Sequence, residues 1–168
     1  MGTNSRNKLA LSGALWGLSL ALLPAVLAFD GFSLSPFLLA ALLFSAISGA
    51  AGALVAGRRA PRRVERAGWT TASGIGAIQG IVMAVLAALL IWLALTATMT
   101  GFSPAAPGKL LGLFAEPAIF LQSALAAIVV FAYAVLLGLL LSPLVGSAIL
   151  RLVREDGGAS RRIAGEAG

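Results

Sequence analysis

The sequence contains neither cysteine nor histidine, and charged residues make up only 11% of its 168 residues. Without cysteine or histidine there is no disulfide, no thiolate nucleophile and none of the usual ligands of zinc or haem. We therefore expect no metal and no cofactor. A soluble domain carries about 25% charged residues. A chain with so few, and with 60% hydrophobic residues, has too little polar surface to cover itself in water. These shortages exclude a soluble globule and predict an integral membrane protein.

Four long apolar runs account for most of the chain. None contains Asp, Glu, Lys or Arg, and they cover residues 9–29, 37–57, 72–98 and 118–150. A helix needs about 20 apolar residues to cross a bilayer, and the runs lack the alternation of a barrel strand. The sequence predicts an all-α integral membrane protein, a four-transmembrane-helix bundle over residues 1–152. The fourth run exceeds the bilayer by about 20 Å, so we expect a kink at Pro143. Residues 153–168 mix charge with glycine and are predicted to form a disordered cytoplasmic tail.

The basic residues are distributed unevenly among the connections. Eleven of the 12 Lys and Arg residues precede the first run, separate the second from the third, or follow the fourth, and Lys109 alone lies between the third and fourth. The positive-inside rule then predicts that both the N and C termini are cytoplasmic. The expected location is the plasma membrane, as a multi-pass protein of the bacterial inner membrane.

The N-terminus allows a second interpretation. Arg6 and Lys8, an apolar run, Pro24 and the small-residue pattern at 26–28 also fit a signal peptide. Cleavage after Ala28 would leave three spans instead of four. The sequence alone leaves this choice open.

Small residues recur every four positions in each run, which is the spacing that lets membrane helices approach closely. The glycines in these small-xxx-small ladders are Gly13, Gly17, Gly49, Gly57, Gly76, Gly80, Gly138 and Gly146. Most of the ladders fall in the cytoplasmic half of the expected spans. We therefore hypothesise a bundle that is tight at its inner end and splayed toward the outside, where Trp92, Thr96 and Gln122 would line a crevice.

No run holds an ionisable side chain of the kind that marks transport or catalysis inside a membrane, so no catalytic residue is predicted and an enzyme is not expected. Five arginines cluster in the second connection: Arg58, Arg59, Arg62, Arg63 and Arg66. They suit contact with anionic lipid headgroups or with a partner. No aromatic residue is interleaved among them for base stacking, so nucleic acid is not an expected partner.

These features predict a non-catalytic membrane protein that acts as a subunit, an assembly factor or a self-associating scaffold. Its expected partners are membrane lipids and either further copies of itself or other membrane subunits. The alternative is a channel or carrier for an uncharged or lipid-like molecule.

Overall fold

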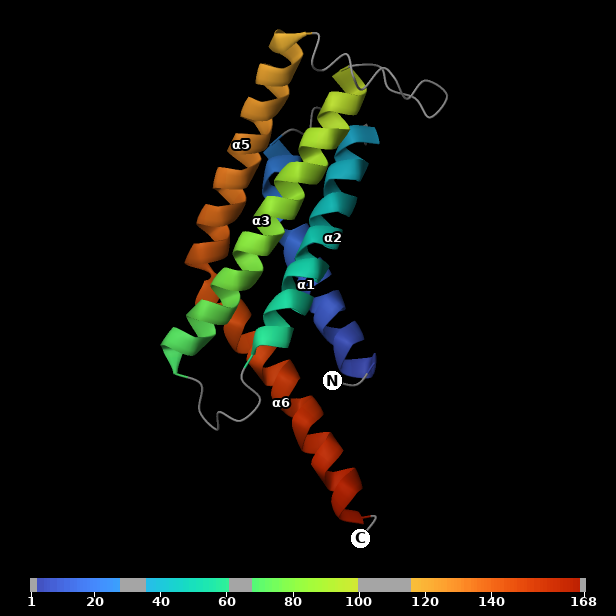
Figure 1. Cartoon of the computed structure of the whole chain (residues 1–168), viewed down its shortest axis with the longest axis vertical. Coiled ribbons are helices and arrows are strands. Elements are labelled where there is room, and N and C mark those ends of the chain that lie inside the picture. Colours follow the sequence, from blue (N-terminus) through green and yellow to red (C-terminus); the bar gives the residue numbers. More distant parts are fainter. Residues whose placement is uncertain (1–2, 28–35, 61–67, 100–115, 167–168) are drawn as a thin grey trace.

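The structure is a computed structural model that describes the backbone of residues 3–27, 36–60, 68–99 and 116–166, and the side chains of 3–21, 39–60, 68–99 and 116–155. Within these segments the chain is all-helical, with five helices and no strand (Figure 1). The helices are α1 (Thr3–Leu27), α2 (Pro36–Arg59), α3 (Trp69–Met99), α5 (Pro117–Leu140) and α6 (Ser142–Glu166). Both α2 and α5 begin at proline, which suits the first helical position because the amide there has no helical acceptor.

Three of the helices are long and apolar enough to cross a membrane, judged over the described residues alone. These segments are Leu39–Arg59, Trp69–Met99 and Pro117–Leu140. The chain is therefore a membrane-embedded helical protein. The first predicted span is helical as α1, but α1 is not among these three, so the number of four spans stays a prediction.

Neighbouring helices run antiparallel and pack mainly in chain order. The helix α1 lies against α2, α2 against α3, and α3 against both α5 and α6 (Figure 1). Contact between α1 and α6 is slight, and α1 and α5 are not among the pairs that pack extensively. The arrangement is thus two helical hairpins, α1–α2 and α3–α5/α6, that meet where α2 packs on α3.

One end of the bundle holds the main hydrophobic core. There α1 and α3 begin, α2 ends and α6 crosses beneath them (Figure 1). The buried cluster draws on α1, α2, α3 and α6, and consists of Leu9, Ala56, Ala60, Ala72, Ile75, Ile149, Leu150 and Val153. We call this the arginine end, because it also carries the exposed Arg58 and Arg59 at the end of α2.

The fourth apolar run is divided into two helices. The break lies at Leu141, two residues before Pro143, where the sequence predicts a kink. The N–H group of Leu141 still donates to the carbonyl of Leu137 at 3.0 Å. Proline has no N–H, so residue 143 cannot pair with the carbonyl of Leu139. The hydroxyl of Ser142 donates to that carbonyl instead, at 2.7 Å.

The last helix, α6, runs from Ser142 to Glu166 and so includes most of residues 153–168, for which the composition predicts a disordered tail. The first turns of α6 are held in the core by Ile149, Leu150 and Val153, which are 2–7% exposed. A helix already nucleated by packing propagates at little further cost, and residue composition does not reveal that nucleus.

Candidate functional site

The first small-residue interface joins α1 to α2. A Cβ atom placed on Gly13 would overlap the carbonyl of Gly49 and lie 2.5 Å from the Cβ of Ala53. A Cβ on Gly17 would overlap the carbonyl of Ser45, and one on Gly49 would overlap the carbonyl of Gly13. The two backbones are therefore in direct contact. Such an approach allows Cα–H···O contacts between helices, and only glycine permits it at these positions.

The second small-residue interface joins α3 to the divided helix α5/α6. A Cβ on Gly76 would overlap the carbonyl of Ser142, and a Cβ on Gly146 would overlap the carbonyl of Ala72. A turn away along α3, a Cβ on Gly80 would lie 3.0 Å from the Cα of Gly138. Because Gly138 precedes the break at Leu141 and Gly146 follows it, α3 contacts both α5 and α6 through glycine.

The remaining ladder glycine, Gly57, has a different environment. Its nearest neighbour is the flexible side chain of Leu9, whose Cδ1 would lie 2.9 Å from an added Cβ. Gly52, which the four-residue spacing missed, is the one that matters between the hairpins. A Cβ there would lie 2.8 Å from the carbonyl oxygen of Gln79 and 3.2 Å from its Cγ. Gly52 is turned by about 60° around α2 from Gly49, and it contacts α3 while Gly49 contacts α1.

Two buried polar side chains lie on the helices that join the hairpins. Gln79 on α3 is 1% exposed and Ser48 on α2 is 0% exposed. Within the described part of the chain, neither the Oε1 atom of Gln79 nor the Oγ atom of Ser48 has a hydrogen-bond partner. Neither residue belongs to a small-residue ladder, so the four-residue spacing did not identify them.

The three expected crevice residues have different surroundings in the structure, and the crevice itself stays a prediction. Trp92 on α3 donates its indole N–H to the hydroxyl of Ser123 on α5 at 3.2 Å, and its ring meets that of Phe120 edge-on with centroids 6.2 Å apart. Thr96 is buried, whereas Gln122 is exposed. The partner of Trp92 is thus Ser123, the residue next to Gln122. One position in a helix turns the side chain by about 100°, which the sequence pattern did not resolve.

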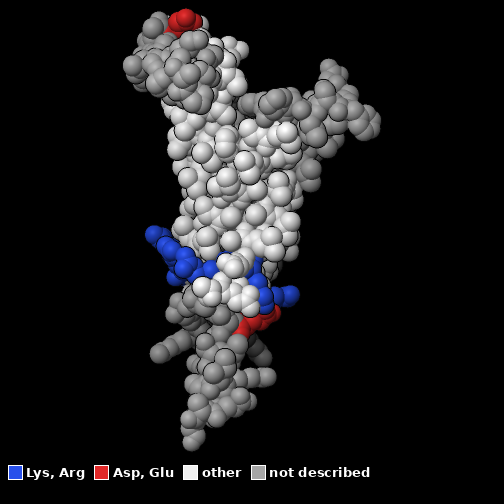
Figure 2. Space-filling model, turned by 90° about the vertical axis from the view of Figure 1, so that its right-hand side faces the viewer, with Lys and Arg blue, Asp and Glu red and all other residues white. Residues whose placement is uncertain are grey.

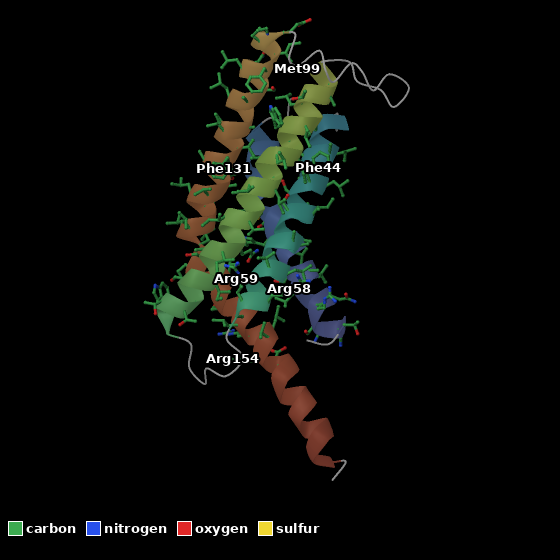
Figure 3. All side chains as sticks on the ribbon, viewed as in Figure 1. Phe44, Arg58, Arg59, Met99, Phe131 and Arg154 are labelled. Carbon is green, nitrogen blue, oxygen red and sulfur yellow. The ribbon has the colours of Figure 1, made fainter. Side chains whose placement is uncertain are left out.

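Exposed basic side chains surround the arginine end. In the described segments they are Arg6, Lys8, Arg58, Arg59, Arg151 and Arg154. Figure 2 shows Lys and Arg gathered in a band below a largely uncharged body, with acidic side chains beside the band and at the opposite end, and Figure 3 places Arg58, Arg59 and Arg154 near one another at the arginine end. Arg62, Arg63 and Arg66 lie outside the described residues. The band has the position that membrane headgroups occupy beside a hydrocarbon layer.

In the described segments no three of His, Cys, Asp and Glu come together as metal ligands would. No family model, curated protein or solved structure matches the chain. The fold, the charge-free body and the basic band define a helical membrane protein, and its function has to be argued from its own geometry.

Proposed function

We propose that the chain is a non-catalytic, multi-pass membrane protein that works as a subunit, assembly factor or self-associating scaffold. The observation that carries this proposal is the backbone contact along both small-residue interfaces. Helices locked through Gly13, Gly49, Gly76 and Gly146 cannot slide or separate without losing that contact along its length. Together with the core at the arginine end, this makes the inner half a rigid body, which suits a scaffold better than an alternating-access carrier.

The proposal includes α1 as a fourth span. The helix has 25 residues, which at 1.5 Å per residue is about 38 Å. It lies antiparallel along the candidate span α2 through Gly13 and Gly17, so it occupies the same depth in the bilayer. This packing also favours retention of α1 in the mature protein over cleavage after Ala28.

We further propose that the arginine end faces the cytoplasm of a bacterial cell, which places both termini there. The support is the segregation of charge. All described Lys and Arg side chains lie at this end, whereas the opposite end carries Glu116. Loops and helix ends rich in Lys and Arg remain on the cytoplasmic side during insertion. In this orientation Arg58 and Arg59 meet the anionic inner leaflet, at about 1 kcal/mol per charge.

Because the ladder glycines contact helices of the same chain, they are not free to bind a partner. Association would use the outer faces of the bundle, and α5 is the least buried of the three candidate spans. The test is to co-express copies with two different tags and extract them with native lipid in polymer nanodiscs. The proposal expects one tag to recover the other, or a membrane subunit in fixed stoichiometry that recovers this chain in return. A single copy accompanied by lipid alone, at every ratio of protein to lipid, would contradict it.

The alternative function, a channel or carrier for an uncharged or lipid-like molecule, is favoured by one observation. At the junction of the two hairpins, Ser48 and Gln79 place hydrogen-bonding atoms that have no partner among the described residues. The test measures solute entry into proteoliposomes by light scattering, with water, glycerol and urea as the probes. Gln79→Met should abolish the flux if this alternative holds, while Gln122→Met, at an exposed position, should leave it intact. If vesicles with the protein take up these solutes no faster than protein-free vesicles, the protein does not transport water, glycerol or urea.

A further inference from the structure

A proline interrupts the hydrogen bonding of α1 within its helical range. The helix continues from Thr3 to Leu27 through Pro24. Because proline has no N–H, the carbonyl of Leu20, four residues earlier, loses the donor that every other position in a helix would supply. In hydrocarbon no water is available to replace it, and an unpaired carbonyl is costly there.

The replacement donor comes from another helix. The hydroxyl of Tyr133 on α5 donates to the carbonyl of Leu20 at 3.0 Å, although the residues are 113 positions apart. Leu20 lies about 26 Å along α1 from Thr3, and Tyr133 lies about 24 Å along α5 from Pro117. Both groups therefore sit well inside the helical body, where a hydroxyl and a carbonyl have few other partners.

We propose that Tyr133 and the carbonyl released by Pro24 form a latch that holds α1 against α5. These two helices do not pack extensively, because α1 is held by α2 and α5 by α3. The two hairpins meet through α2 and α3, and the latch joins their other two helices, α1 and α5. We call the boundary between α1 and α5 the seam. Loss of the hydrogen bond between Tyr133 and Leu20 lets the seam open while both small-residue interfaces stay intact. This inference rests on α1 spanning the membrane, which is part of the proposed function, but not on the proposed role as a subunit or scaffold.

Pro143 provides the comparison within the same chain. Its missing amide is compensated by Ser142 from the adjoining position of α6. That solution is local and leaves the helices uncoupled. At Pro24 the replacement donor is a side chain of another helix, Tyr133 on α5. A residue with a backbone N–H at position 24 could donate to the carbonyl of Leu20 itself, and Tyr133 would then no longer be needed as the donor.

The experiment combines Tyr133→Phe with Pro24→Ala in a double-mutant cycle in lipid nanodiscs. Tyr133→Phe should lower the folding equilibrium constant about threefold or more, the typical worth of a hydrogen bond between membrane helices. In the Pro24→Ala background the amide of residue 24 can pair with Leu20, so the same change should have little effect. An equal loss in both backgrounds, or no loss in the natural one, would overturn the latch. If Tyr133→Phe fails to fold, rescue by Pro24→Ala supports the proposal and failure to rescue contradicts it.

A distance measurement tests the opening of the seam directly. The chain has no cysteine, so spin labels can be attached at Ser19→Cys on α1 and Val129→Cys on α5, both of which are exposed. We expect one distance in the natural background and an added, longer population with Tyr133→Phe. Phe131→Leu, an exposed change on the same helix, is the matched control and should leave the single distance unchanged. An unchanged distribution with Tyr133→Phe would show that the hydrogen bond does not hold the seam.

Discussion

Glycine within a helix costs about 1 kcal/mol relative to alanine, so its repeated use here needs a compensating gain in packing. Gly74 and Gly76, two residues apart on α3, separate the cost of glycine in a helix from its gain in packing. An added Cβ at Gly74 meets nothing within 4 Å, whereas at Gly76 it meets the backbone of Ser142. Backbone cannot rotate away as a side chain can. The small-residue interface therefore depends on individual glycines and not on the general abundance of small residues.

Alanine at these two positions should have opposite effects. Gly74→Ala should leave the free energy of unfolding unchanged or raise it by up to about 1 kcal/mol. Gly76→Ala should lower it by about 1–3 kcal/mol, because α3 and α6 must separate to admit the methyl group. Unfolding by steric trapping in bicelles measures both. Equal effects at the two sites would mean that the contact between Gly76 and Ser142 does not contribute to stability.

Ser142 stabilises the break between α5 and α6 through its hydroxyl group. Its hydroxyl donates to the carbonyl that Pro143 deprives of an amide. Ser147, five residues later, donates at the same 2.7 Å to the carbonyl of Leu144, which also has the helical amide of residue 148. We expect Ser142→Ala to cost about 1–2 kcal/mol and Ser147→Ala less than about 0.5 kcal/mol, measured in the same unfolding assay. Equal losses of stability in the two variants would show that Ser142 does not replace the amide that is missing at Pro143.

At the scale of helices, α2 shows what the sequence pattern captured and what it missed. Counting small residues at intervals of four identified Gly49, which meets α1, but it passed over Gly52, which meets α3. A helix between two neighbours needs two faces of small residues, and a single repeat describes only one. The long apolar runs predicted the helical segments well because hydrophobicity and length are properties of the chain itself. Which residue of α5 pairs with Trp92 depends on helix rotation, which only packing determines.

Gln79 allows a prediction for the junction of α2 and α3. Its Oε1 atom is buried without a partner in the described part of the protein, and an unsatisfied buried acceptor costs about 1–3 kcal/mol. Gln79→Met keeps the unbranched shape that packs on Gly52 and removes that acceptor. The variant should be as stable as the natural protein or up to about 1 kcal/mol more stable by thermal or chemical unfolding in bicelles. A clear loss of stability would show that Gln79 has a partner, such as a bound water or ligand.

At the scale of the whole molecule, the two hairpins are built in the same way. In each, a helix that leaves the arginine end pairs through glycine with the helix that returns to it: Gly13 with Gly49, and Gly76 with Ser142. The hairpins are joined along α2 and α3, and Tyr133 links their other two helices, α1 and α5. The sequence showed four ladders but not their pairing, because pairing depends on which surfaces meet. The distribution of Lys and Arg, by contrast, already predicted that the basic residues lie on one side of the membrane, and the structure brings the described ones to one end of the bundle.

Membrane orientation can be tested on this architecture with single cysteines, since the natural chain has none. Thr70 and Thr98 lie near opposite ends of α3, and Thr3 begins α1; all three are exposed. An impermeant maleimide should label Thr98→Cys on intact cells, while Thr70→Cys and Thr3→Cys should react only after the membrane is permeabilised. Labelling of Thr70→Cys with protection of Thr98→Cys would invert the orientation. Labelling of Thr3→Cys alongside Thr98→Cys would mean that α1 does not cross the membrane, and absence of Thr3→Cys from the mature protein would indicate a cleaved signal peptide.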